Sequence, residues 1–148
     1  MRHDIRAEID IEAPPAEVWR HLVDLAAFQD WNPFIPVASG VPEVGQKLSL
    51  RLQPPGGRGI TIRPTVTEVV QASVLEWLGH LVVPGLFDGR HRFELMPTPS
   101  GTHLVQSESF GGLLVRLLRR SLDGGTRAGF EAMNTALRRR VREAHPTA

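Results

Sequence analysis

The spacing of apolar residues changes after about residue 111, and this change constrains the fold more than any other feature. In the last quarter of the chain, apolar and small residues form a stripe with a spacing of three or four positions, as in an amphipathic α-helix: Leu114, Leu118, Leu122, Thr126, Gly129, Met133 and Leu137. Gly124 and Gly125 permit a kink, because each glycine costs about 1 kcal/mol relative to alanine within a helix. The stripe stays in phase across the pair, so we expect one long helix or two nearly collinear halves.

The first three quarters of the chain favour strands. Residues 5–12 alternate between apolar and charged side chains, which is typical of a strand with one buried face. Pro14-Pro15 ends this strand, and two short helices are expected between residues 15 and 30. Alternating segments between turn signals predict further strands at 47–53, 60–70, 74–81, 90–96 and 102–110, with a short one near 37–39. Pro64 lies inside one of these segments, so we expect a sheet edge or a bulge there.

Composition narrows the class of protein. The chain has 148 residues, of which 41% are hydrophobic and 22% charged, and this suits a single domain spanning residues 1–148. The absence of cysteine excludes disulfides, thiolate metal sites and cysteine nucleophiles, and it suits a reducing compartment. The N-terminal segment lacks an apolar secretion signal, and no run of 18 apolar residues exists to span a bilayer. We therefore expect a cytoplasmic protein without stable membrane insertion.

Charge and histidine spacing argue against several kinds of site. The net charge of +1 disfavours a dedicated nucleic-acid binder, although residues 112–148 carry 8 basic and only 3 acidic side chains. A basic cluster at Arg138-Arg139-Arg140 suits the solvated face of the terminal helix. The six histidines show no spacing typical of zinc ligands, so no metal is expected. No Gly-rich phosphate loop precedes a helix, and no cofactor is expected either.

The order of elements predicts an α+β fold with its helices on one face of an antiparallel sheet. Two early motifs, Ala13-Pro14-Pro15-Ala16-Glu17-Val18-Trp19 and Trp31-Asn32-Pro33-Phe34, and three later segments, 75–79, 89–95 and 101–110, carry a resemblance that covers nearly the whole chain. They resemble the START-like or SRPBCC superfamily, in particular its bacterial polyketide cyclase/dehydrase-like, lipid-transport-like members. The resemblance implies a helix-grip fold, in which a curved antiparallel sheet of six or seven strands wraps around a long C-terminal helix and leaves a cavity.

Strand parity predicts which polar side chains face the interior. His91 and Phe93 share one face of their strand, and Gln106 and Glu108 share one face of the last strand. If both faces point inward, a carboxylate lies beside an imidazole on adjacent strands, an arrangement that can move protons. The same pair can instead be a structural hydrogen bond, because buried polar groups need partners whether or not they do chemistry.

The loops and the terminal helix supply further candidates. Trp31, Phe34 and Trp77 can form aromatic walls, and Asn32 can orient a carbonyl or hydroxyl group or simply cap a turn. Small residues around Gly129 would leave room for a ligand, or would let helix and sheet approach closely. The candidate ligand-binding set is Trp31, Asn32, Phe34, Trp77, His91, Phe93, Gln106, Glu108, Gly129 and Met133, and the candidate catalytic pair is His91 and Glu108.

Three functions are compatible with these residues. The leading hypothesis is binding of a small hydrophobic molecule, polyketide-, lipid- or aromatic-like, in a cavity between the sheet and the terminal helix. The second is an enzyme of cyclase, dehydratase or hydrolase type, in which His91 and Glu108 transfer protons while Asn32 and Gln106 hold an oxygen. The third is a partner-binding module, with a homodimer as one form, that uses the apolar loop 82–87 and the arginine-rich helix. That loop can form a cavity lid, a partner contact or a tip that dips into a membrane, and we favour the lid.

Overall fold

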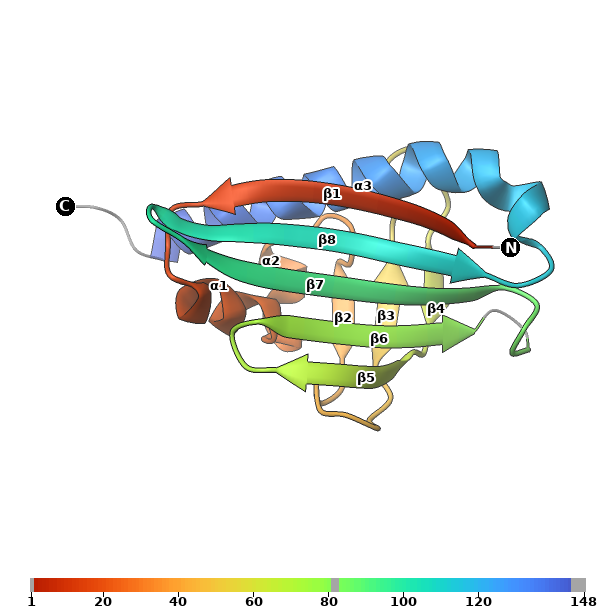
Figure 1. Cartoon of the computed structure of the whole chain (residues 1–148), viewed down its shortest axis with the longest axis horizontal. Helices are drawn as coiled ribbons and strands as arrows, with labels where there is room; N and C mark the ends of the chain where they lie inside the picture. The colour runs from red at the N-terminus through yellow and green to blue at the C-terminus, as the bar shows by residue number, and fades with distance from the viewer. Residues whose placement is uncertain (1, 81–82, 145–148) are drawn as a thin grey trace.

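The computed structural model describes residues 2–80 and 83–144 (Figure 1), and for residues 118, 119, 121 and 122 it describes the backbone alone. The described residues form eight strands, three α-helices and one short 3-10 helix. In chain order these are β1 (His3–Ile11), α1 (Pro15–Leu22), η1 (Leu25–Ala27), α2 (Phe28–Trp31), β2 (Val37–Ser39), β3 (Ser49–Leu52), β4 (Ile60–Ile62), β5 (Thr65–Val70), β6 (Val74–His80), β7 (Asp88–Thr98), β8 (Gly101–Gly111) and α3 (Val115–Ala144).

The strands form two antiparallel sheets that share one core. The larger sheet has the order β1-β8-β7-β6-β5, and the smaller one has the order β2-β3-β4. Figure 1 shows α3 and the smaller sheet on the same side of the larger sheet, with α3 running along β1 and β8. The α+β helix-grip prediction is therefore confirmed, with α3 held against the concave face of the sheet.

The predicted strand 60–70 is divided in the structure, and this is the main difference from the expected single sheet of six or seven strands. The chain leaves β4 at Ile62 and enters β5 at Thr65, with Pro64 between the two strands. Proline has no N–H to donate and restricts the residue before it, so the hydrogen-bond ladder cannot continue through this point. The two sheets remain linked beside the break, because the Leu48 N–H donates to the Pro64 carbonyl at 2.9 Å.

Helix α3 runs without interruption through Gly124 and Gly125. Buried side chains hold the helix against the sheet on both sides of this pair, with Val115 before it and Met133 and Leu137 after it. This packing outweighs the cost of about 1 kcal/mol per glycine, because most helix stability in proteins comes from the buried face. The expectation of one long helix is confirmed, and α3 does not break at the two glycines.

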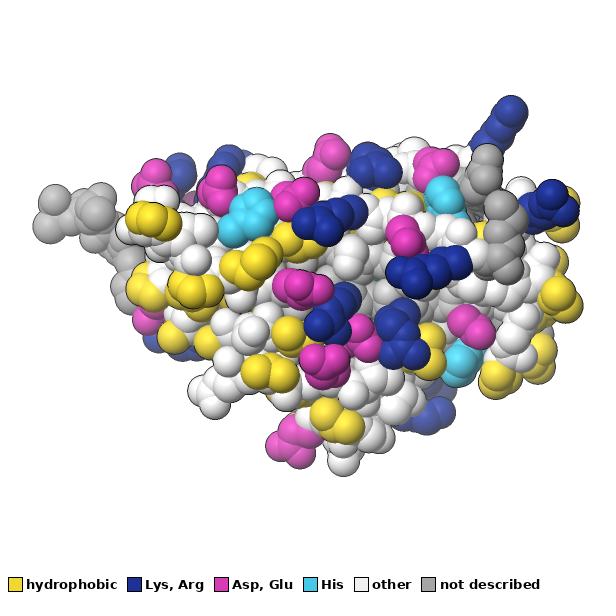
Figure 2. All heavy atoms as spheres, in the orientation of Figure 1, with side chains coloured by type: hydrophobic (Ala, Val, Ile, Leu, Met, Phe, Trp, Pro, Cys, Tyr) yellow, Lys and Arg dark blue, Asp and Glu magenta, His cyan; other side chains and the backbone are white. Residues whose placement is uncertain are grey.

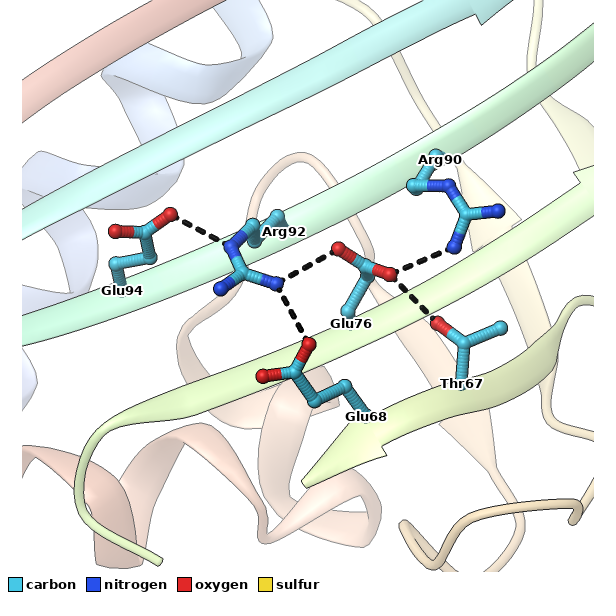
Figure 3. Close-up of polar contacts among 6 residues, drawn as sticks. All are labelled: Thr67, Glu68, Glu76, Arg90, Arg92 and Glu94. Carbon is cyan, nitrogen blue, oxygen red and sulfur yellow. Dashed lines mark hydrogen bonds and ion pairs between the residues drawn. The ribbon is translucent and has the colours of Figure 1, made fainter. Parts of the chain in front are cut away.

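The outer face of the larger sheet is charged rather than apolar (Figure 2). Figure 3 shows its central ion-pair network, in which Arg90 and Arg92 of β7 contact the Glu76 carboxylate of β6 at 2.7 and 2.9 Å. Burial of Glu76 opposes its ionisation, but hydrogen bonds from Arg90, Arg92 and Thr67 more than offset this effect and lower the pKa of Glu76. The network ties β5, β6 and β7 together, while apolar side chains gather on the opposite face.

Candidate functional site

A cavity of about 310 Å³ lies between the two sheets and α3. Its walls come from β3, β4, β6, β7, β8 and α3, together with the loops that follow α2, β3 and β6. Most of the lining side chains are apolar, and the full set is Phe34, Leu52, Pro54, Ile60, Ile62, Trp77, Gly79, His80, Phe87, Gly89, Glu108, Phe110 and Thr126. The smaller sheet forms one wall of this space. A single flat sheet would have no such wall, so the cavity depends on the division of the strands at Pro64.

Glu108 places a carboxylate on the wall of this apolar cavity. Strand β8 points Glu108 to the concave side, where its Oε1 lies 2.7 Å from His91 Nδ1 of the neighbouring strand β7. Gly89, also on β7, gives the carboxylate room, because a Cβ at that position would collide with Glu108 Oε2. The hydrogen bond to His91 and the space beside Gly89 therefore hold the Glu108 carboxylate facing the cavity.

The hydrogen bonds behind Glu108 assign the protons of His91. Gln106 donates from its Nε2 to Asn134 Oδ1 at 2.8 Å and to the Phe130 carbonyl at 3.5 Å, so its Oε1 is left to accept. His91 Nε2 lies 3.0 Å from that Oε1 and must therefore carry a proton. His91 Nδ1 and Glu108 Oε1 then share one further proton, either as an imidazolium beside a carboxylate or as an imidazole beside a carboxylic acid.

Aromatic rings hold the His91 imidazole in place. The Trp77 ring stacks on it with centroids 5.1 Å apart and an interplanar angle of 13°, and Phe130 meets it edge-on at 4.9 Å. Phe93 approaches to 4.6 Å, and only 3% of His91 is exposed. His91 therefore lies behind Glu108 in the core, so a molecule in the cavity would meet the carboxylate rather than the imidazole.

The predicted inward faces of β7 and β8 are confirmed, but only some predicted site residues line the cavity. Phe34, Trp77 and Glu108 do so. His91, Phe93 and Gln106 are buried behind this wall, and Met133 is fully buried on α3. The structure thus joins His91, Gln106 and Glu108 in one network and places two of them out of reach of a ligand.

Three further candidates have local structural roles. A Cβ at Gly129 would collide with the ring of Phe34, so this glycine allows close packing and its space is filled. Asn32 Oδ1 accepts hydrogen bonds from the Phe34 and Ile35 N–H groups at 3.0 and 2.9 Å, as the turn-capping alternative predicts. Trp31 packs edge-on against Phe28 with ring centroids 5.2 Å apart. Asn32 is not among the residues that line the cavity, and its Nδ2 has no hydrogen-bond partner among the described residues, so the oxygen-holding role stays a prediction.

Several cavity residues were not among the predicted site residues. They are Leu52, Pro54, Ile60, Ile62, Gly79, His80, Phe87, Gly89, Phe110 and Thr126, of which the first four belong to the smaller sheet and its loop between β3 and β4. The alternation around Leu52 and Ile62 indicates strands, but the sequence does not show that these strands form a separate wall. Phe87, from the loop considered as a lid, also lines the cavity and stacks on Phe110 at 5.5 Å. Residue 82 of that loop lies outside the described residues.

His3, His80 and His103 each pair with a carboxylate. His103 contacts Glu8 at 2.8 Å and Asp10 at 2.7 Å. The hydrogen bond to Glu8 and, to a smaller extent, the one to Asp10 raise the pKa of His103. Within residues 2–80 and 83–144, no group of three or more histidine and acidic side chains is placed to hold a metal ion. In the same part of the chain, no helix is long and apolar enough to cross a membrane.

Comparison with known families gives a match over nearly the whole chain. The model of the family described as "Polyketide cyclase / dehydrase and lipid transport" matches residues 2–143. The chain belongs to this family. The resemblance predicted from the sequence motifs is thereby confirmed, whereas a search of curated proteins found no match.

Solved structures of similar fold include an aromatase/cyclase. This family member superposes on the Zhui aromatase/cyclase from Streptomyces sp. R1128 with a TM-score of 0.80 at 16% identity, covering 99% of this chain and 98% of that one. Protein TTHA0849 from Thermus thermophilus gives 0.77 at 19% identity, covering 97% and 99%. Protein MLL2253 from Mesorhizobium loti gives 0.73 at 22% identity, covering 98% and 100%. Membership of this family supports a ligand-binding or polyketide-related role.

Proposed function

We propose that this protein binds a small, mostly apolar molecule in the cavity between its two sheets and α3, with Glu108 as the polar contact. The observation that carries the proposal is the cavity itself, whose volume of about 310 Å³ lies within the range of ligand pockets in proteins. Phe34, Trp77 and Phe110 offer aromatic surface on its walls. A carboxylate on an apolar wall favours a ligand with one hydrogen-bond donor, such as a hydroxyl or an N–H group.

Filling the cavity should abolish binding of a neutral apolar probe. N-phenyl-1-naphthylamine carries two aromatic groups and one N–H, which matches this lining. Thr126 of α3 lines the cavity, so Thr126→Trp would place an indole in the space that the probe needs. We expect the dissociation constant of the probe, measured by its fluorescence on titration, to rise about tenfold or more.

Thr135→Trp is the matched control, because Thr135 is exposed on the same helix, away from the lining residues. It makes the same chemical change and should leave the dissociation constant within about twofold of the unmodified protein. Equal probe binding by both variants would show that the probe does not occupy this cavity, and the proposal would fail.

The proton shared by His91 and Glu108 favours a second candidate function, a cyclase or dehydratase. Glu108 lines the cavity and could take a proton from a carbon between two carbonyl groups, while His91 holds the carboxylate and supplies or accepts the shared proton. Gln106 then acts as a positioning residue that sets the His91 tautomer rather than as a ligand contact. Of Glu108, His91 and Gln106, only Glu108 would contact the substrate.

Glu108→Gln separates catalysis from binding. The new amide can donate to His91 Nδ1, so the hydrogen bond is kept while the acid–base group is lost. With a linear 3,5-dioxo ester as substrate, we expect the rate of ring closure, followed by ultraviolet absorbance, to fall about a hundredfold or more. Binding of N-phenyl-1-naphthylamine should persist. A rate unchanged by the substitution, or no acceleration by the unmodified protein over buffer, would count against the enzyme.

A further inference from the structure

Two leucines are almost fully exposed where β8 leads into α3. Leu113 is 82% exposed and Leu117 is 81% exposed, while Val115 between them is buried. Val83, in the loop between β6 and β7, is 52% exposed. Large apolar side chains exposed together are unusual on a soluble surface and indicate a site of contact.

Backbone hydrogen bonds join this loop to the beginning of α3. The Leu113 N–H donates to the Gly85 carbonyl at 3.2 Å, and the Leu114 N–H donates to the Leu86 carbonyl at 3.0 Å. Figure 1 shows both segments at the same end of the larger sheet, beside the N-terminus. Phe87, next in the chain, lines the cavity, so the loop that binds the beginning of α3 also leads into the cavity wall.

Two exposed arginines flank Leu117 on α3. Arg116 and Arg120 are exposed, and with Leu117 they fall within an arc of about 100° on the helix, since successive residues advance by about 100°. Residues 112–122 contain three arginines and no acidic residue. The next acidic side chain, Asp123, lies 2.6 Å from His3 Nε2. This end of the molecule therefore combines apolar and cationic side chains, and Figure 2 shows both kinds at its right-hand edge.

We propose that Val83, Leu113, Arg116, Leu117 and Arg120, the basic apolar patch, docks reversibly on an anionic lipid surface. The leucines would enter the boundary between headgroups and acyl chains while the arginines contact lipid phosphates, which is the general pattern of helices that lie on membranes. This is surface attachment, and α3 stays folded on the sheet. The proposal goes beyond ligand binding and does not depend on it.

Charge decides between a lipid surface and a second copy of the chain. In a two-fold dimer through this patch, the patch meets its own copy, so Arg116 and Arg120 of both chains would gather in one interface. Like charges brought together at an interface are unfavourable, whereas anionic lipid offers the complementary charge. The observations therefore favour the membrane over a homodimer at this site.

The test measures co-sedimentation of the full chain with vesicles. Vesicles of phosphatidylcholine mixed with phosphatidylglycerol should bind the unmodified protein, and vesicles of phosphatidylcholine alone should bind it about tenfold or more weakly. Leu117→Asp should weaken binding to the mixed vesicles at least about tenfold, as should the double variant Arg116→Glu with Arg120→Glu. Raised salt should weaken binding of the unmodified protein.

Val44→Asp is the matched control, because Val44 is also exposed, at 62%, but lies outside the basic apolar patch. Its segment, residues 36–46, contains Glu43 and no lysine or arginine. It should bind vesicles as the unmodified protein does, and circular dichroism melting should show that all variants fold. Equal binding by Leu117→Asp and the unmodified protein would overturn the proposal, as would no binding to mixed vesicles. Concentration-dependent self-association in sedimentation velocity, lost in Leu117→Asp, would assign the patch to a second copy instead.

Discussion

Replacing Phe130 with alanine should lower the free energy of unfolding by about 3–5 kcal/mol. Phe130 is fully buried on α3 and meets two parts of the site edge-on, with ring centroids 5.6 Å from Phe34 and 4.9 Å from His91. Removing the ring would leave a cavity where helix and sheet meet, and the stacked rings on the sheet cannot close it without moving His91. For a chain of this length, we expect the melting temperature to fall by roughly 10 °C.

Urea denaturation followed by circular dichroism measures this effect. Leu117→Ala is the control, because Leu117 lies on the same helix but is exposed, and its free energy of unfolding should change by no more than about 0.5 kcal/mol. If Phe130→Ala cost less than about 1 kcal/mol, α3 could not be packed against the sheet through this ring.

Residues that follow a short local period were the easiest to place from the sequence. The alternation of His91 with Phe93, and of Gln106 with Glu108, fixes the faces of two strands because a strand has a period of two wherever it occurs. Their antiparallel pairing places His91 opposite Glu108, as the structure shows. The contact within this pair could therefore be anticipated before any long-range geometry was known, whereas its chemical role remains a proposal.

Knowing that a residue is buried does not show what it contacts, so the roles of some predicted site residues stayed ambiguous. Gly129 fits either an open space or a close contact, and only the position of Phe34, nearly a hundred residues earlier in the chain, shows that the space is filled. Val105 is buried on the outer face of β8, so a buried side chain does not by itself identify the concave side. These outcomes depend on contacts between distant segments, which local patterns do not encode.

The cavity walls were hardest to predict for a related reason. Leu52 and Ile62 belong to strands whose alternation is clear, but they line the cavity because Pro64 diverts the chain into a second sheet. Because proline has no N–H, the sequence predicts that the hydrogen-bond ladder is disturbed at Pro64, but it does not predict in which direction the chain then turns.

Gln106→Leu should lower the free energy of unfolding by about 2–4 kcal/mol, although it replaces a polar side chain with an apolar one of similar size. Gln106 is fully buried and accepts from His91 while it donates to Asn134. Leucine would leave the His91 Nε2–H and the Asn134 Oδ1 without partners, and each buried unpaired group costs about 1–3 kcal/mol. Urea denaturation measures the loss, and Gln46→Leu at an exposed position should change stability by no more than about 0.5 kcal/mol.

A double variant shows that the loss comes from unpaired polar groups rather than from poor packing. Asn134 Nδ2 is buried without a hydrogen-bond partner among the described residues, so Asn134→Leu removes one unpaired donor and, beside Gln106→Leu, the orphaned Oδ1 as well. The two substitutions together should therefore cost about 0.5–3 kcal/mol less than the sum of the single ones. Additive costs would mean that Gln106 and Asn134 act independently. The network would then lose its anchor on α3, and with it the reason why His91 must carry its proton on Nε2.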